Sequence, residues 1–154
     1  MRYLFLLAAP LLLAGPAASA TVDLRLDRLS PALKLVNEQD RRVVDTAIQL
    51  IQRGENSLAL AQLAALTKSH PENSSVRVLT AYAMLQLGNL LGAFEEAKKA
   101  ESSGNGNSYT CWFLAKVALL TGDKDVCKRE LKHVKKMGDM AADAQALDKE
   151  VKQK

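Results

Sequence analysis

The side chains with the most chemical potential in this 154-residue chain are its two cysteines and two histidines. Cys111 and Cys127 do not have the spacing of a zinc site or of a dithiol redox motif. His70 and His133 have no carboxylate or nucleophile at a spacing that marks a catalytic pair. The segment Gly104–Gly106 lacks the lysine and glycine pattern of a phosphate-binding loop. The sequence therefore predicts no catalytic residues, no bound metal and no cofactor, and we expect a protein that is not an enzyme.

Three glycines, Gly54, Gly88 and Gly122, set a repeat along the chain, because 88 − 54 = 34 and 122 − 88 = 34. Each glycine lies between two stretches with apolar residues at three- and four-residue steps, the pattern of a helix with one buried face. A glycine at such a position ends the first helix of a pair. Small residues seven positions before and five after each glycine would let two antiparallel helices approach closely. These six residues are Ala47, Ala81, Ala115, Ala59, Ala93 and Cys127.

This pattern resembles the tetratricopeptide repeat family through those small residues, the three glycines and the loop proline Pro71. The resemblance covers about residues 40–141. It implies an all-α fold, a right-handed array of antiparallel helical hairpins with about three repeats at 40–138 and a C-terminal capping helix at 139–154. The repeats depart from the family pattern. The large aromatic residue expected eleven positions before each glycine is replaced by Val43, Arg77 and Cys111, and the later loop prolines are replaced by Asn105 and Asp139.

Within a hairpin of this kind the two cysteines are poorly placed for a disulfide. Cys111 lies eleven residues before Gly122 and Cys127 five after it, which offsets them by roughly 9 Å along the helix axes at 1.5 Å per residue. The helices themselves are about 8–10 Å apart, whereas a disulfide needs Cα atoms within about 7 Å. We therefore expect two small buried residues rather than a bridge.

The N-terminus has the features of a secretory signal peptide over residues 1–20. A basic start at Arg2 precedes an apolar run from Leu4 to Leu13, and Ala18-Ser19-Ala20 is a small-residue cleavage site. The alternative is an uncleaved anchor. Since no later segment approaches transmembrane length, we expect no stable membrane insertion after cleavage. The expected location is the periplasm or the extracellular medium, in a bacterium rather than a eukaryote.

Residues 21–39 should form an N-terminal arm and the start of the first helix. Apolar and charged residues alternate from Thr21 to Leu29, which is typical of a strand, but no second strand is predicted to pair with it. We expect an extended arm, or an arm laid on the helices. Ser30 and Pro31 have the residue types of a helix N-cap and first turn, and the helix that follows could break at 37–40. Near the other end, the 101–108 loop is predicted to be flexible.

The resemblance places a concave groove along the first helix of each hairpin. The predicted groove is apolar with aromatic residues toward its C-terminal half, and it has a cation at each end, which suits a protein or peptide partner with apolar side chains. The alternative is that these residues pack between repeats or under the arm. Val44 and Ile48 stand where a carboxylate-clamping subgroup of the family needs lysine or asparagine, which argues against that mode. The groove residues are Arg41, Val44, Ile48, Tyr82, Leu85, Tyr109, Trp112 and Lys116.

A second surface is basic. Its residues are Lys128, Arg129, Lys132, Lys135 and Lys136. They could dock on an anionic envelope component or an acidic partner, or could simply form a solvated helix face. Aromatic residues do not interleave with them, so nucleic acid is not an expected partner. The sequence thus predicts an exported interaction module or scaffold in the assembly of an envelope or secreted complex, and leaves the partner and the oligomeric state open.

Overall fold

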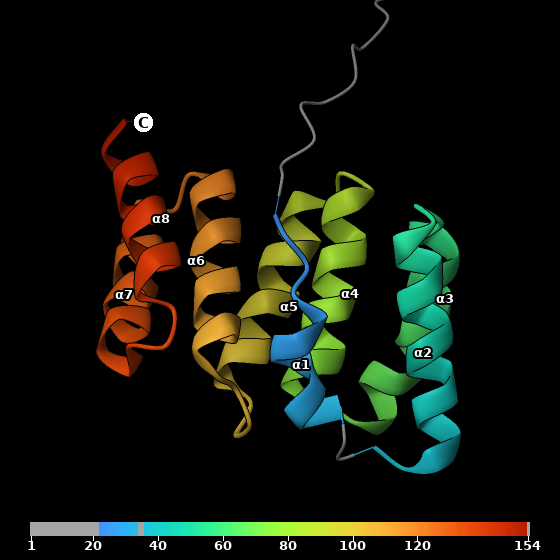
Figure 1. Ribbon diagram of the computed structural model, residues 1–154. Coiled ribbons are helices and arrows are strands. Elements are labelled where there is room, and N and C mark those ends of the chain that lie inside the picture. The colour runs from blue at the N-terminus through green and yellow to red at the C-terminus, as the bar shows by residue number, and fades with distance from the viewer. Residues whose placement is uncertain (1–21, 34–35, 154) are drawn as a thin grey trace, which may run out of the picture.

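The computed structural model describes residues 22–33 and 36–153 and forms an array of helical hairpins (Figure 1). Within these residues every regular element is an α-helix, so the predicted all-α fold class is confirmed. The signal peptide predicted at 1–20 lies outside the described residues. The helices are α1 (Leu26–Leu33), α2 (Glu38–Gln52), α3 (Asn56–Ser69), α4 (Ser74–Gln86), α5 (Leu90–Ser102), α6 (Ser108–Thr121), α7 (Lys124–Met137) and α8 (Ala141–Gln153).

The three repeating glycines form the turns between paired helices. Gly54, Gly88 and Gly122 have φ angles of 78°, 78° and 85°, which is the left-handed region that side chains with a Cβ rarely adopt. A Cβ added at any of them would meet no atom within 4 Å. The backbone conformation, rather than a lack of space, therefore requires glycine at these positions and closes the hairpins α2–α3, α4–α5 and α6–α7.

The small residues flanking the turns lie in the hairpin seams. Ala47, Ala81, Ala59 and Ala93 are completely buried, as are Ala115 and Cys127 in the third hairpin. Longer apolar side chains such as Leu63 and Leu131 fill the space farther from the turns, and both are at most 2% exposed. The core is accordingly built largely of alanine, leucine and valine. The C-terminal segment buries an apolar stripe made of Met140, Ala144, Leu147 and Val151. Its helix α8 packs against α7 at the end of the array (Figure 1).

The region before the first hairpin differs from the sequence prediction. The expected N-cap Ser30 and first-turn Pro31 lie inside α1, which begins four residues earlier at Leu26. The physical reason is the spacing of Leu26, Leu29 and Leu33, which puts one apolar face on a helix, and Leu29 is 1% exposed. The break expected near 37–40 is confirmed, because Asn37 caps α2 by accepting a hydrogen bond from the Asp40 N–H at 2.9 Å.

The loop at 101–108, predicted to be flexible, is tied to the preceding repeat. The Ser74 N–H donates to the Asn105 side-chain oxygen at 2.9 Å, and the Ser74 hydroxyl donates to the Asn105 carbonyl at 3.0 Å. Asn107 then caps α6 in a capping box with Thr110. Two asparagines therefore fix the exit from the second hairpin where the family pattern would have a proline.

Candidate functional site

We call the surface formed by α2, α4 and α6 the groove face, because it carries the predicted groove residues. In Figure 1 the N-terminal arm (residues 22–25) and α1 run across it in front of α4 and beside α6. The arm approaches in extended form and then turns into the short helix α1, which packs against α4. The arm and α1 therefore divide the groove face into a covered half over α6 and an open half toward α2.

Tyr109 is the centre of the covered half. It is completely buried, and its ring stacks on Trp112 with a centroid separation of 5.7 Å. Its hydroxyl donates to the Asp23 carbonyl at 2.9 Å and accepts from the Arg25 N–H at 3.1 Å. Burial raises the pKa of this phenol to about 12, so it stays protonated and able to donate at neutral pH. One side chain thus binds the arm through both types of backbone group.

Arg25 holds the arm with its side chain as well. Its guanidinium lies over the Trp112 ring at 5.7 Å, a distance at which cation–π attraction operates. The same guanidinium donates to both carboxylate oxygens of Asp143 in α8, one of them at 2.9 Å. Such a two-point arginine–carboxylate pair is among the stronger polar contacts in proteins. The arm is therefore bridged to the C-terminal helix across the covered half.

Two further side chains bind the backbone of α1. The Ser75 hydroxyl of α4 donates to the Leu29 carbonyl at 2.9 Å, and the Asn107 amide donates to the Arg28 carbonyl at 2.8 Å. The Arg28 guanidinium also pairs with Asp139 at 3.0 Å. Four of the hydrogen bonds are made to main-chain atoms of the segment. The side chains of Arg25 and Arg28 add contacts to Trp112, Asp143 and Asp139. The groove face therefore holds this segment both through its backbone and through its side chains.

The predicted groove residues divide between the two halves. Tyr109 and Trp112 lie under the arm, Val44 and Leu85 are buried, and Arg41 is exposed. Lys116, expected to orient a partner, is instead ion-paired with Glu150 of α8 at 2.5 Å, and its side chain is only 16% exposed. Ile48 and Tyr82 are partly buried and pack against the core.

Sequence reasoning did not identify the residues that complete this site. They are Asp23, Arg25, Leu29, Asn107, Asp139 and Asp143. The alternation of apolar and charged residues in the arm was the available signal. It could not show which helices the arm would lie against.

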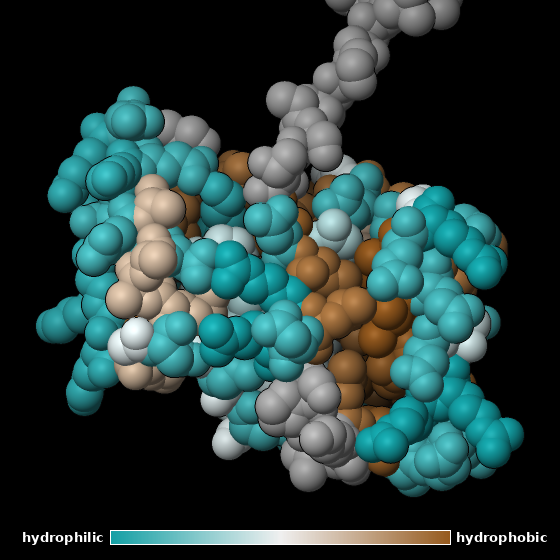
Figure 2. All heavy atoms as spheres, viewed as in Figure 1, coloured by the Kyte–Doolittle hydropathy of each residue, from teal (hydrophilic) through white to brown (hydrophobic). Residues whose placement is uncertain are grey.

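The open half exposes apolar surface. Figure 2 shows brown, hydrophobic surface in a hollow between α1 and α2. Partly buried apolar side chains on the surrounding elements include Leu26 and Leu33 of α1, Ile48 of α2 and Tyr82 of α4. In the covered half, the Trp112 indole N–H is buried and has no hydrogen-bond acceptor among the described residues. The open half of the groove face therefore has an apolar surface that the arm does not cover. The covered half contains one buried hydrogen-bond donor, the Trp112 N–H, that no acceptor among the described residues uses.

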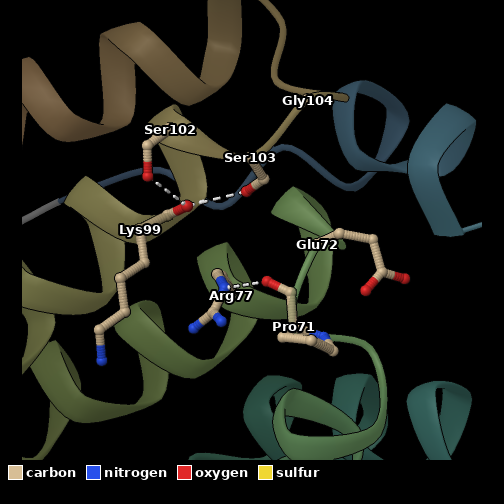
Figure 3. A pocket seen from close by; sticks show the side chains of 7 residues that line it. All are labelled: Pro71, Glu72, Arg77, Lys99, Ser102, Ser103 and Gly104. Carbon is tan, nitrogen blue, oxygen red and sulfur yellow. Dashed lines mark hydrogen bonds between the residues drawn. The ribbon is translucent and has the colours of Figure 1, made fainter.

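A surface pocket of about 430 Å³ lies elsewhere, between the α3–α4 loop and the C-terminal end of α5 (Figure 3). Its two cations are already engaged, because Arg77 and Lys99 both pair with Glu96, at 2.8 and 2.6 Å. The hydroxyls of Ser102 and Ser103 donate to the Lys99 carbonyl. Its polar groups thus satisfy one another, and the pocket offers no set of groups converging on a small ligand.

The predicted basic surface lies on α7, where all five cationic residues are exposed. Arg129 pairs with Glu130 at 2.7 Å, and Lys135 pairs with Asp148 of α8 at 3.1 Å. Lys128, Lys132 and Lys136 have no ion pair with any described residue. Three of the five predicted cations therefore remain without an ion pair among the described residues, so the unpaired positive charge on this surface is smaller than the sequence predicted.

Both thiols are buried, as the hairpin spacing predicted, and both are free.

In the part of the chain that the structure describes, no helix has the length and apolar character needed to cross a bilayer. In comparisons with known proteins, no family model matches the chain and no curated protein is similar to it.

Proposed function

We propose that this protein is a non-enzymatic, polypeptide-binding module of the tetratricopeptide-like type, exported and acting in the assembly of an envelope or secreted complex. The observation that carries the proposal is the arm on the groove face. Tyr109, Ser75 and Asn107 bind main-chain carbonyls or N–H groups of the segment 23–29. A surface that recognises backbone in this way suits a peptide partner.

The partner proposed here is a protein segment with apolar side chains that lies beside α1 in the open half. Ile48 and Tyr82 would contact it, and the exposed guanidinium of Arg41 would lie at the edge. The hydrophobic hollow of Figure 2 is the matching surface. Apolar burial would provide the affinity, since rigid aromatic side chains such as Tyr82 are favoured anchors at interfaces.

Backbone recognition by the groove face can be tested with the arm itself. A full-length Arg25→Ala, Leu29→Ala variant should hold its own arm weakly and should bind a fluorescent peptide of sequence 22–33 in trans, measured by anisotropy. The wild-type protein should bind the same peptide at least tenfold more weakly, because its groove is occupied. A peptide carrying Arg25→Ala is the matched control. Equal binding to both proteins, or no binding to a variant with unchanged helical circular dichroism, would contradict the proposal.

The position of a natural partner can be tested by site-specific photocrosslinking in the native host. A crosslinking residue at Ile48 should capture a defined polypeptide, whereas the same residue at Leu58, an exposed apolar position on α3, should not. Capture at Leu58 alone would place the partner elsewhere.

The second candidate is docking through the basic surface, favoured by Lys128, Lys132 and Lys136, which lack ion-pair partners among the described residues. Binding by that route should weaken steeply as ionic strength rises, because exposed charges are screened. Binding in the open half should change little with salt. A Lys128→Glu, Lys132→Glu variant should abolish basic-surface docking and leave capture at Ile48 intact.

A further inference from the structure

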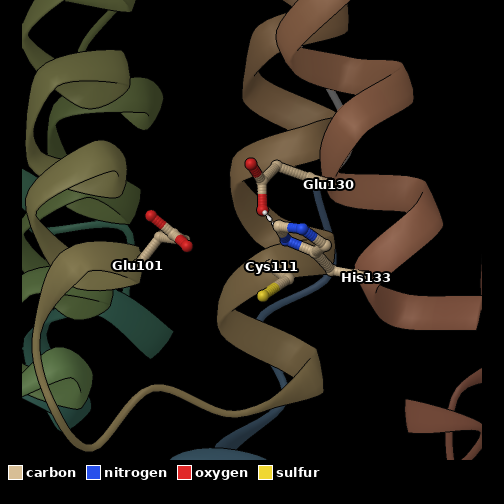
Figure 4. A group of neighbouring side chains, drawn as sticks. All are labelled: Glu101, Cys111, Glu130 and His133. Atoms are coloured by element: carbon tan, nitrogen blue, oxygen red, sulfur yellow. Dashed lines mark hydrogen bonds and ion pairs between the residues drawn. The ribbon is translucent and has the colours of Figure 1, made fainter. Parts of the chain in front are cut away.

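Four side chains with metal-binding donor atoms meet where α5, α6 and α7 come together (Figure 4). Glu101 comes from the C-terminal end of α5, Cys111 from α6, and Glu130 and His133 from successive turns of α7. One donor atom from each residue lies within 4.8 Å of the donor atoms of the other three. The residues are far apart in sequence and have no motif spacing, so this group is visible only in the folded chain.

The buried half of the cluster is rigid and the outer half is accessible. Glu130 is completely buried and Cys111 is 7% exposed, so both are fixed by the packing of α6 against α7. Glu101 is partly exposed, and the His133 side chain is 46% exposed. An ion could therefore enter from solvent past the two outer residues and reach the two inner ones.

The carboxylate of Glu130 is already oriented as a metal ligand would be. One oxygen accepts from the Arg129 guanidinium at 2.7 Å, and the other lies 3.3 Å from the His133 ring nitrogen Nδ1. Hydrogen bonds of this kind to the non-ligating oxygen commonly orient carboxylate ligands in metal sites. The Arg129 guanidinium can stay bonded to one Glu130 oxygen while the other oxygen binds an ion. The ion pair between Arg129 and Glu130 therefore does not block the site.

The charges in the cluster favour a cation. The carboxylates of Glu101 and Glu130 each place an oxygen within 4.8 Å of the Cys111 sulfur. Two carboxylates thus face a buried thiol, with Arg129 as the adjoining cation. A divalent ion would supply additional positive charge, and a thiol bound to such an ion loses its proton.

We propose that Glu101, Cys111, Glu130 and His133 form a binding site for a divalent transition-metal ion of the zinc type. Thiolate and imidazole ligands select zinc and its neighbours over magnesium and calcium, which prefer oxygen donors alone. In a tetrahedral zinc site with bonds of about 2.0–2.3 Å, neighbouring donors lie about 3.3–3.8 Å apart. The cluster reaches that geometry by a contraction of about 1 Å, which rotamer changes of Glu101 and His133 can supply.

Binding would link two repeats. Glu101 belongs to the second hairpin and the other three residues to the third, so the ion would join them beside the 101–108 loop. On binding, the Cys111 S–H bond breaks, the sulfur forms a bond to the ion with its electron pair, and the proton passes to solvent. No redox partner is required. The site has four protein ligands, which is the number found in structural zinc sites.

The test is titration of the reduced, tag-free protein with Co²⁺, which reports thiolate ligation by a charge-transfer band and tetrahedral geometry by intense visible bands. We expect one ion per chain, displacement by Zn²⁺, and a rise in the unfolding temperature with either ion. Cys111→Ser should remove the charge-transfer band, and His133→Ala should weaken binding at least tenfold. The chain supplies matched controls, because Cys127→Ser and His70→Ala remove its other cysteine and histidine, and both should leave the spectrum unchanged.

Glu101→Gln is a further variant with little risk to folding, since Glu101 is partly exposed and the substitution keeps the size of the side chain. It should weaken Co²⁺ binding at least tenfold while the circular dichroism of the metal-free protein stays the same. Absence of a thiolate band in the wild-type protein would overturn the proposal. So would a band that survives Cys111→Ser, or one that is lost on Cys127→Ser alone.

Discussion

The two halves of the groove face have similar origins and different surroundings. Both are built from first helices of repeated hairpins and carry a tyrosine, Tyr109 on α6 in the covered half and Tyr82 on α4 in the open half. Tyr109 is completely buried and binds two backbone groups of the arm, whereas Tyr82 is only partly buried. The difference shows that one end of the face is already covered by the chain itself, while the other retains partly exposed apolar surface.

The largest effect should come from truncating these two tyrosines. Tyr109→Ala removes a buried ring that stacks on Trp112, and large aromatic truncations of this kind cost about 3–5 kcal/mol. Tyr82→Ala should cost clearly less, since its ring is partly exposed already. Urea unfolding of both variants measures the difference. Equal losses would show that the two halves are equally integrated in the fold.

Alkaline pH should destabilise the covered half, by less than the truncation of Tyr109 does. The pKa of Tyr109 is about 12 in the folded chain against 10.0 for the free side chain. Because the folded value is raised, its stabilising contribution is complete below pH 10 and is lost as the pH rises toward 12. The loss is at most about 2–3 kcal/mol. It can be followed by tyrosinate absorbance and Trp112 fluorescence.

Tyr109→Phe is the control for this titration, since it keeps the ring and removes the ionisable group. Lysines that titrate in the same range affect both proteins alike. The wild-type protein should therefore lose more stability than the variant between pH 10 and 12. Parallel losses would mean that the Tyr109 phenol does not report on the arm.

Breaking the arginine bridge should loosen the arm without unfolding the array. Asp143→Ala removes the partner of Arg25, and because both side chains are partly exposed, at 32% and 25%, the expected cost is about 1 kcal/mol. Amides of 22–33 should exchange about fivefold faster in hydrogen-exchange mass spectrometry. Asp148→Ala is the control in the same helix, because Asp148 pairs with Lys135 and Lys152 and not with the arm.

The smallest effect should come from the edge of the open half. Arg41 is exposed, so Arg41→Ala should change the free energy of unfolding by no more than about 0.5 kcal/mol. It should also leave arm exchange unchanged. A decrease in partner capture at Ile48 without any loss of stability would separate binding from folding in this half, and a large destabilisation would show that Arg41 supports the fold.

Local patterns were enough to predict the hairpins because the forces involved are local. Glycine recurs at positions 54, 88 and 122 because each hairpin turn needs a left-handed backbone conformation that only glycine adopts easily. The small residues around them follow from close helix packing. The start of α1 could not be predicted in the same way, since two periodicities overlap between residues 22 and 33. One is the strand-like alternation that runs to Leu29, and the other is the three- and four-residue steps of Leu26, Leu29 and Leu33. Burial of Leu29 against the array decided between them.

The covered half shows the same limit for the candidate site. Tyr109 and Trp112 could be placed on one face of α6 from their spacing, but their arm contacts join residues such as Arg25 and Asp143, which no local pattern connects. Lys116 was likewise placed correctly on its helix, and only the position of α8 showed that Glu150 pairs with it.

By itself, the sequence determined the repeat length, the turn residues, the helical class and the burial of both cysteines, because each depends on backbone conformation or on spacing along one hairpin. The tertiary structure alone decided that the arm lies on the groove face. It also decided that Cys111 meets Glu101, Glu130 and His133. Both depend on how separate helices are brought together, and that is set by the burial of apolar area over the whole array, a quantity to which residues distant in the chain contribute jointly.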